Sequence, residues 1–356
     1  MKKITTYLFS AIMAAGLFSG CTASADKEAI TKDMDTLTMT REWDKTFPKS
    51  DKVNHGKVTF RNRYGITLAA DLYEPKNIYP EEKLPAIAVS GPFGAVKEQA
   101  SGYYARTMAE RGFVTLAFDA SYTGESGGEP RNTASPDINT EDFSAAVDFL
   151  TSHPVVDPER IGIIGICGFG GMGLNAAAMD TRIKATVTST MYDMSRVNAN
   201  GYFDAEDSAE ARDSKRRAMN EIRTRDAQSG TVTAGIPGLP DSITGDEPQF
   251  VRDYYDYYKT PRAFHPRSVA SNGAWSPTMP LSFINMPLMS YIGEIASPVM
   301  LIHGENAHSR YFSEDAFKKL KGDNKRLFIV EGANHTDLYD RKVPFDEIEA
   351  FFKQNL

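Results

Sequence analysis

Short, almost uninterrupted apolar runs recur along the chain, and most are followed by a stretch with helical spacing. Such a run is typical of a strand that is buried on both faces of a sheet. Parallel neighbours in a sheet need crossover connections of helix length, so the repetition predicts a mostly parallel central sheet with helices on both faces, an α/β fold. The runs occupy residues 84–90, 113–118, 161–166, 183–189, 299–303 and 326–330.

This alternation has a different beginning and one long interruption. Two alternating runs, 55–61 and 66–74, flank Tyr64-Gly65 and predict an antiparallel hairpin ahead of the parallel strands. From about 194 to 295 the rhythm stops, and charged, tyrosine-rich and proline-rich stretches take its place. We therefore predict one domain over residues 52–356, with residues 194–295 inserted into it as a cap.

The first residues predict export from the cytoplasm. Lys2 and Lys3 precede an apolar stretch that is too short to span a bilayer, so residues 1–20 are expected to be a signal peptide. The stretch ends in Leu17-Phe18-Ser19-Gly20-Cys21, which resembles the processing signal of bacterial lipoproteins. That resemblance implies a lipid on Cys21, a tether over residues 21–51, and a membrane-anchored protein of the bacterial cell envelope, facing the periplasm or the cell surface. A plain secretory signal with an incidental cysteine is the alternative.

Composition excludes some partners and cofactors. The chain has 40 Lys and Arg residues against 47 Asp and Glu residues, a net charge of −7, whereas a nucleic-acid-binding protein needs a basic surface. Two cysteines and six histidines leave little room for a Cys-rich zinc module. If Cys21 carries a lipid, Cys167 is a lone thiol in an oxidising compartment, and its presence there requires a reason.

Cys167 stands where the strand predicted over residues 161–166 turns into a helix. In Gly165-Ile166-Cys167-Gly168-Phe169-Gly170-Gly171, small neighbours let the helix pass close to the strand, and the turn holds a nucleophile in a strained conformation. Because the N-terminal end of a helix stabilises negative charge, we expect this thiol to ionise easily. The alternative is a glycine-rich turn around a buried, inert cysteine. The P-loop and Rossmann spacings do not fit.

These residues resemble the α/β-hydrolase superfamily and, within it, the dienelactone-hydrolase-like branch. The branch's Gly-x-Cys-x-Gly-Gly elbow is matched by Gly165 to Gly168 and by Gly170-Gly171, although Phe169 stands where a glycine is usual. Residues 91–99 and 124–128 extend the similarity, which covers about residues 55–356. The resemblance implies an α/β-hydrolase fold, a nucleophile–acid–histidine order along the chain, and neither a metal nor an organic cofactor.

A cysteine nucleophile needs a base within reach and a group that orients this base. In the α/β-hydrolase fold the histidine follows the last strand, and His335 stands directly after the run 326–330. The acid usually follows the seventh strand, but Ala307 occupies its place. Glu305, two residues earlier, is the first candidate for the acid, and Asp193, after the sixth strand, is the second. A site with neither is the third possibility.

The oxyanion of an acyl-transfer reaction needs two preorganised backbone N–H groups. Gly168, directly after the nucleophile, is expected to supply one of them. The loop Gly91-Pro92-Phe93-Gly94 is expected to supply the other. Since proline has no N–H, Phe93 is the favoured donor and Gly94 the next.

We therefore expect a hydrolase that cleaves a small-molecule ester, lactone or thioester through an acyl-cysteine intermediate. Two alternatives remain open. A surface binding lipoprotein without turnover is favoured by Phe169 and Ala307, and a peptidase or acyltransferase would use the same site. Cap aromatics would either line a substrate pocket or pack in the core; they are Tyr254, Tyr255, Tyr257, Tyr258, Trp275 and Phe283.

Overall fold

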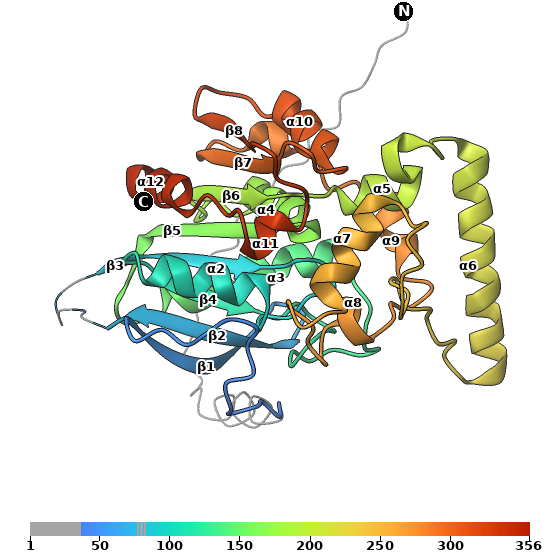
Figure 1. Ribbon diagram of the computed structural model, residues 1–356, viewed down its shortest axis with the longest axis horizontal. Coiled ribbons are helices and arrows are strands. Elements are labelled where there is room, and N and C mark those ends of the chain that lie inside the picture. The colour runs from blue at the N-terminus through green and yellow to red at the C-terminus, as the bar shows by residue number, and fades with distance from the viewer. Residues whose placement is uncertain (1–36, 77, 79–80, 82) are drawn as a thin grey trace, which may run out of the picture. The chain divides into compact units, whose positions relative to one another are not determined.

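A computed structural model describes residues 37–76, 78, 81 and 83–356. Within this part of the chain the strands are β1 (Val53–Arg61), β2 (Thr67–Pro75), β3 (Leu84–Ser90), β4 (Val114–Phe118), β5 (Val156–Ile166), β6 (Ala185–Ser189), β7 (Val299–Gly304) and β8 (Lys325–Val330). They form one sheet in the order β1-β2-β4-β3-β5-β6-β7-β8 (Figure 1). β2 pairs antiparallel with β1 and β4, and the remaining pairs are parallel. The predicted hairpin and the predicted parallel sheet are both present.

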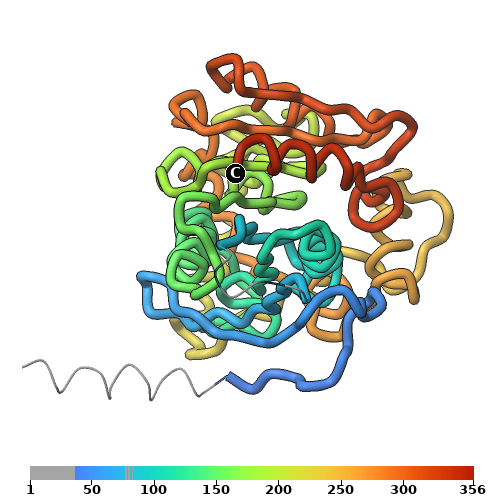
Figure 2. Tube along the Cα trace, turned by 90° about the vertical axis from the view of Figure 1, so that its left-hand side faces the viewer, coloured from blue at the N-terminus to red at the C-terminus, as the bar shows by residue number. Residues whose placement is uncertain are grey.

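Helices cover both faces of the sheet. α2 (Ala100–Ala109) and α12 (Phe345–Asn355) lie over one face, and α3 (Pro136–Thr151), α4 (Gly168–Met179) and α10 (Arg310–Lys319) lie over the other (Figures 1 and 2). β3 shows why its run is apolar at almost every position. Ala86 and Ala88 belong to the core on one face, and Ile87 and Val89 belong to the core on the other.

Capping residues set where individual helices begin and end. The Ser135 hydroxyl accepts a hydrogen bond from the Ile138 N–H, and Pro136 occupies the start of α3, where a missing N–H leaves no intrahelical bond unmade. Ser208 caps α6 (Ala209–Ser229) in the same way, and Gly230 ends that helix in the left-handed conformation at φ 68°.

The insertion expected over residues 194–295 lies between β6 and β7. It contains α6 and four further helices, with 3₁₀ turns at Tyr202–Asp204 and Ile292–Glu294. α6 stands away from the sheet at the right of Figure 1, and Met219 is its one buried residue. The other helices of the insertion are α5 (Met194–Asn200), α7 (Gln249–Tyr258), α8 (Val269–Asn272) and α9 (Pro280–Asn285).

Residues 37–51 belong to the compact unit, which corrects the predicted extent of the tether. Phe47 is buried, the Lys45 ammonium lies 2.7 Å from the Asp71 carboxylate, and the Thr46 N–H donates to the Glu98 carbonyl at 2.9 Å. Figure 2 shows this segment in blue beside the β1–β2 edge of the sheet. The predicted signal peptide, Cys21 and the rest of the predicted tether lie outside the described residues. None of the described helices has the length and apolarity that a bilayer crossing requires.

Candidate active site

Cys167 lies in the sharp turn between β5 and α4, with φ 56° and ψ −126°. This conformation is rarely adopted by residues with a side chain and costs about 1–3 kcal/mol, so neighbouring contacts must hold it. Three backbone hydrogen bonds do so, each 2.9 Å long: the Cys167 N–H donates to Ser189, and the Cys167 carbonyl accepts from Gly170 and Tyr192. The turn therefore has the nucleophile-elbow geometry that the sequence predicts.

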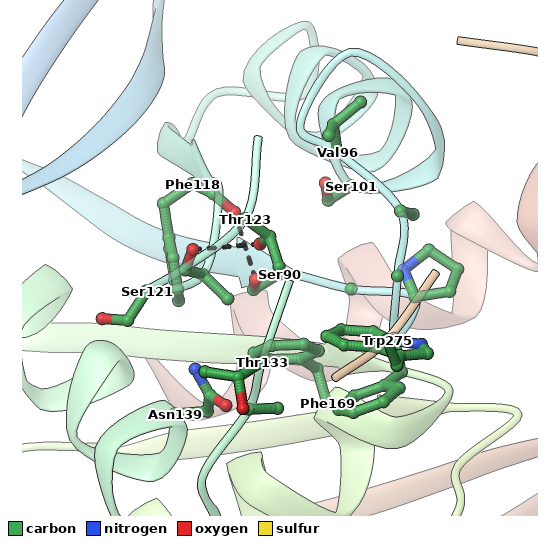
Figure 3. A pocket seen from close by; sticks show the side chains of 17 residues that line it. Ser90, Val96, Ser101, Phe118, Ser121, Thr123, Thr133, Asn139, Phe169 and Trp275 are labelled. Carbon is green, nitrogen blue, oxygen red and sulfur yellow. Dashed lines mark hydrogen bonds between the residues drawn. The ribbon is translucent and has the colours of Figure 1, made fainter. Parts of the chain in front are cut away.

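Close packing around the turn explains its glycines and its unusual phenylalanine. A Cβ atom on Gly165 would overlap the Phe169 carbonyl oxygen, and one on Gly91 would overlap the Ile166 carbonyl oxygen. Phe169 itself is buried, with its ring 6.4 Å from the Phe93 ring, and it borders a cavity of about 10 Å³ behind the 91–94 loop (Figure 3). A cavity of this size holds about one water molecule, so the core beneath the 91–94 loop is almost completely packed.

Two backbone donors converge on the Cys167 sulfur. The N–H groups of Phe93 and Gly168 both hydrogen bond to it, so the structure brings the predicted nucleophile together with the two predicted oxyanion donors. The Phe93 ring stacks on the Trp275 ring at 4.3 Å, and the Gly94 carbonyl accepts from the Ala270 N–H at 2.9 Å. The oxyanion loop is therefore held between the elbow and the cap.

His335 reaches Cys167 through a hydroxyl that sequence analysis did not identify. The Tyr339 hydroxyl lies 2.9 Å from His335 Nε2 and also hydrogen bonds to the Cys167 thiol. Tyr339 belongs to α11 (Asp337–Asp340), four residues after His335. That spacing brings two side chains together on a helical turn, and it is the sequence signal that could have identified this residue.

Neither predicted acid contacts His335. Glu305 is exposed, and its carboxylate accepts from the Gly332 N–H at 2.8 Å. Asp193 instead caps α5, accepting from the N–H groups of Ser195 and Arg196 at 3.0 Å each. Glu305 points outward because of its register on the loop after β7, and the inward position in that loop belongs to Ala307, which is buried and has no carboxylate.

Two hydroxyls occupy the place of the acid. His335 Nδ1 lies 2.6 Å from Ser309 Oγ and 2.8 Å from Thr190 Oγ1. Three possibilities for the acid were open: Glu305, Asp193 or neither. In the described residues neither carboxylate contacts His335, which corresponds to the third possibility.

A cavity of about 230 Å³ opens above Cys167, beneath the cap. Tyr254, Tyr258 and Trp275 line it, whereas Tyr257 and Phe283 are buried in the core and Tyr255 bonds through its hydroxyl to the Asp241 carbonyl. The cap aromatics are therefore divided between pocket and packing. No lining residue carries a charge; the lining is Phe93, Cys167, Tyr192, Met194, Val197, Tyr202, Gly238, Leu239, Tyr254, Tyr258, Val269, Ala270, Trp275 and Tyr339.

Comparison with known proteins supplies the family. The model of the X-Pro dipeptidyl-peptidase (S15) family matches residues 64–337, which include the elbow and His335. The chain belongs to the S15 family. Pseudomonas aeruginosa protein PA2218 is 61% identical over 323 residues, which cover 90% of this chain and 86% of PA2218. A crystal structure of PA2218 superposes with a TM-score of 0.87 at 62% identity, covering 90% of this chain and 99% of that one.

Two fungal proteins are more distant from this S15-family chain. The thiohydrolase aneE of Aspergillus aculeatus is 32% identical over 139 residues, 39% of this chain and 42% of aneE. The α/β hydrolase GrgF of Penicillium sp. sh18 has a TM-score of 0.69 at 20% identity, with 85% of this chain and 99% of GrgF covered. The α/β-hydrolase fold predicted from the sequence is confirmed.

Burial determines the protonation states of Cys167 and His335 in this S15-family protein. It raises the pKa of the Cys167 thiol, although the Tyr339 hydroxyl and the two backbone N–H groups act in the opposite direction. Burial, together with His308 and His303, lowers the pKa of His335 well below its usual value. The expectation of an easily ionised thiol is therefore wrong for the free protein: at neutral pH both groups are uncharged.

This protonation state predicts how Cys167 reacts with iodoacetamide, which attacks the thiolate. We expect the labelling rate of Cys167 to rise only above the pH at which an exposed cysteine, with a pKa of about 8.5, is already half ionised. Peptide mass spectrometry across a pH series measures it. A cysteine on the exposed face of α6, Thr224→Cys in a Cys167→Ser background, is the matched reference. A midpoint for Cys167 at or below that reference would contradict the burial argument.

Proposed function

We propose that this protein cleaves neutral acyl thioesters or esters through an acyl-enzyme on Cys167. One observation carries the proposal: the thiol and its two N–H donors stand at the foot of an uncharged, aromatic cavity. Such a cavity favours an apolar acyl group, and the donors stabilise the negative oxygen that forms when a thiol attacks a carbonyl.

The contacts around Cys167 supply each step of this reaction. As the sulfur–carbon bond forms, the carbonyl electron pair moves to the oxygen, which Phe93 and Gly168 hold. The thiol proton passes to the Tyr339 oxygen while the Tyr339 proton passes to His335 Nε2. His335 returns a proton to the departing thiol or alcohol by the same route, and water then attacks the acyl-cysteine with His335 again as the base.

The aromatic cavity also bears on the peptidase alternative, which the S15 family match favours. An X-Pro dipeptide substrate carries a protonated N-terminal amine, and its burial needs a carboxylate partner. The lining contains none. The name of aneE, a thiohydrolase, further supports thioester chemistry over peptide cleavage. We therefore place the thioesterase or esterase reaction first and the peptidase second.

We also propose, from the sequence, where the protein is located and to which branch of the superfamily it is related. The signal Leu17-Phe18-Ser19-Gly20-Cys21 supports a lipid on Cys21 and a place on a membrane of the bacterial cell envelope. The Gly165-Ile166-Cys167-Gly168 elbow supports a relationship to the dienelactone-hydrolase-like branch. Detergent-phase partitioning of the full chain, lost in Cys21→Ala, tests the anchor. A wild-type protein that stays in the aqueous phase would refute it.

A substrate panel tests the proposed reaction. Acetyl, hexanoyl and benzoyl thioesters of N-acetylcysteamine are compared with the matching p-nitrophenyl esters and with alanyl-prolyl p-nitroanilide. We expect the best thioester or ester to exceed the anilide by about 100-fold or more in kcat/KM, and its acyl group to be trapped on the Cys167 peptide. Faster cleavage of the anilide would establish the peptidase instead. The absence of any adduct in a folded protein would favour the binding lipoprotein.

A further inference from the structure

A second histidine continues the hydrogen-bond chain behind His335. Ser309 Oγ lies 2.6 Å from His335 Nδ1 and 2.9 Å from His303 Nε2. On its other side, His303 Nδ1 lies 2.6 Å from Ser313 Oγ. All four side chains are buried, and no carboxylate of the described residues hydrogen bonds to either imidazole. The chain His335–Ser309–His303–Ser313, which we call the relay, therefore lies where an acid would be expected.

We propose that His303 is a positioning residue that, through Ser309, does the orienting work of the missing acid. The proposal rests on the function proposed above, because it concerns how His335 becomes the base for Cys167. It assigns a role to a histidine that the sequence marks only by its place at the end of a strand.

The proton count along the relay leads to this assignment. His335 Nε2 acts as a base only when the ring proton is on Nδ1, and this N–H then needs an acceptor oxygen. Ser309 Oγ accepts it when its own single hydrogen points toward His303 Nε2. That nitrogen is free to accept when the His303 proton is on Nδ1, where it is donated to Ser313. Through Ser309, the state of His303 therefore favours the Nδ1–H form of His335, for which Thr190 Oγ1 is a second acceptor at 2.8 Å.

Thr190 provides a second and independent observation. It is a β-branched residue at φ 47°, in the left-handed region that such residues rarely adopt. This backbone places its hydroxyl 2.8 Å from His335 Nδ1 and 3.4 Å from His303 Nε2, beside Ser309. Its N–H holds the conformation by donating to the Ile302 carbonyl at 2.7 Å. Strain retained at a residue that contacts both imidazoles indicates that their spacing matters to the protein.

The surroundings keep the relay uncharged at rest. Burial, with His308 and Arg310, lowers the pKa of His303 to about 3, so His303 is neutral at neutral pH. The nearest further imidazole, His308, is also depressed by burial, to a pKa of about 4, and bonds to the Tyr192 hydroxyl. The charge that appears on His335 during the reaction is thus met by hydroxyl dipoles instead of a carboxylate.

The imidazole nitrogens report the relay directly. In ¹⁵N-histidine spectra of the full chain at pH 7, we expect His335 in the Nδ1–H form. In Ser309→Ala the Nε2–H form should gain population, and kcat for the best thioester should fall about 10- to 100-fold while KM changes less than about twofold. His303→Gln should act in the same direction. Thr115→Val is the matched control, because its buried hydroxyl bonds to the Ala105 carbonyl, away from both histidines.

Each outcome of this experiment decides for or against the relay. His335 in the Nε2–H form in the wild type would overturn it, and so would an unchanged tautomer and an unchanged kcat in both variants. Ser309→Ala removes one oxygen only, so it keeps the test decisive if His303→Gln fails to fold. If no acyl substrate is turned over but the tautomers behave as expected, the proposed function fails and the relay stands.

Discussion

Replacing Cys167 by alanine is expected to lower kcat for the best acyl substrate by about 10⁴-fold or more, because every later step depends on the sulfur–carbon bond. The acyl adduct on the Cys167 peptide should disappear at the same time. Stopped-flow release of the leaving group and peptide mass spectrometry measure the two effects. Substrate binding, followed by tyrosine fluorescence, should persist, because the aromatic lining remains in place.

The matched variant is Cys167→Ser, which keeps a nucleophile of nearly the same shape. We expect a much smaller acylation rate than in the wild type, but an adduct on residue 167 that the alanine variant cannot form. Both variants should melt within a few degrees of the wild type, because a nearly isosteric change in the elbow leaves its backbone bonds intact. Full activity in Cys167→Ala, or an adduct on another residue, would remove Cys167 from the reaction.

Replacing Lys97 by methionine is expected to reduce the free energy of unfolding by about 3–5 kcal/mol. The Lys97 ammonium is fully buried and lies 2.7 Å from Asp119, 2.7 Å from Glu125 and 2.9 Å from Glu98. Methionine retains most of the volume but leaves three buried carboxylates with one cation fewer. Urea denaturation of the full chain measures the loss. The matched control is Lys353→Met, whose pair with Glu349 is exposed and should cost less than about 1 kcal/mol.

The same cluster predicts an acid limit of stability. Burial alone would raise the pKa of Glu125, but Lys97 and Lys57 lower it from 4.5 to about 2 in the folded protein. A carboxyl group with a depressed pKa stabilises the fold above its unfolded pKa, so this contribution should be lost as the pH falls from about 4.5 to 2. The pH dependence of the melting temperature measures it. Lys97→Met should show a smaller loss in this window, and an equal loss would contradict the pairing.

Local patterns made much of the fold and part of the site predictable. The run 161–166 and the glycines around Cys167 specify a buried strand and a tight turn without reference to distant residues. The order of nucleophile and histidine along the chain then follows from the fold. Pro92 cannot be an N–H donor because proline has no backbone N–H. Each of these inferences depends on residues that are close in sequence, where spacing and steric limits determine the structure.

The remaining features depend on contacts between distant segments. The family pattern predicts a carboxylate near residue 307, whereas Ser309 and Thr190 reach His335 from the start of α10 and the end of β6. The thiol was expected to ionise easily because the end of a helix is visible in sequence, but the burial that outweighs it comes from the whole fold. Residues 37–51 look like a polar tether because the partners of Lys45 and Thr46 lie elsewhere in the chain.

The stacking of Phe93 on Trp275 couples the 91–94 loop to the cap. Without this contact, substitutions in the loop and in the cap could accumulate independently. The Phe93 N–H hydrogen bonds to the Cys167 sulfur, and Trp275 belongs to the cap and lines the cavity proposed to bind the acyl group. A substitution that widens the pocket at Trp275 also removes a support of the donor beside it. If descendants of this protein acquire a new acyl preference, we therefore expect residues 91–94 and the cap to change together. A substitution in the cap that alters the preference would be paired with one in residues 91–94 that restores the rate.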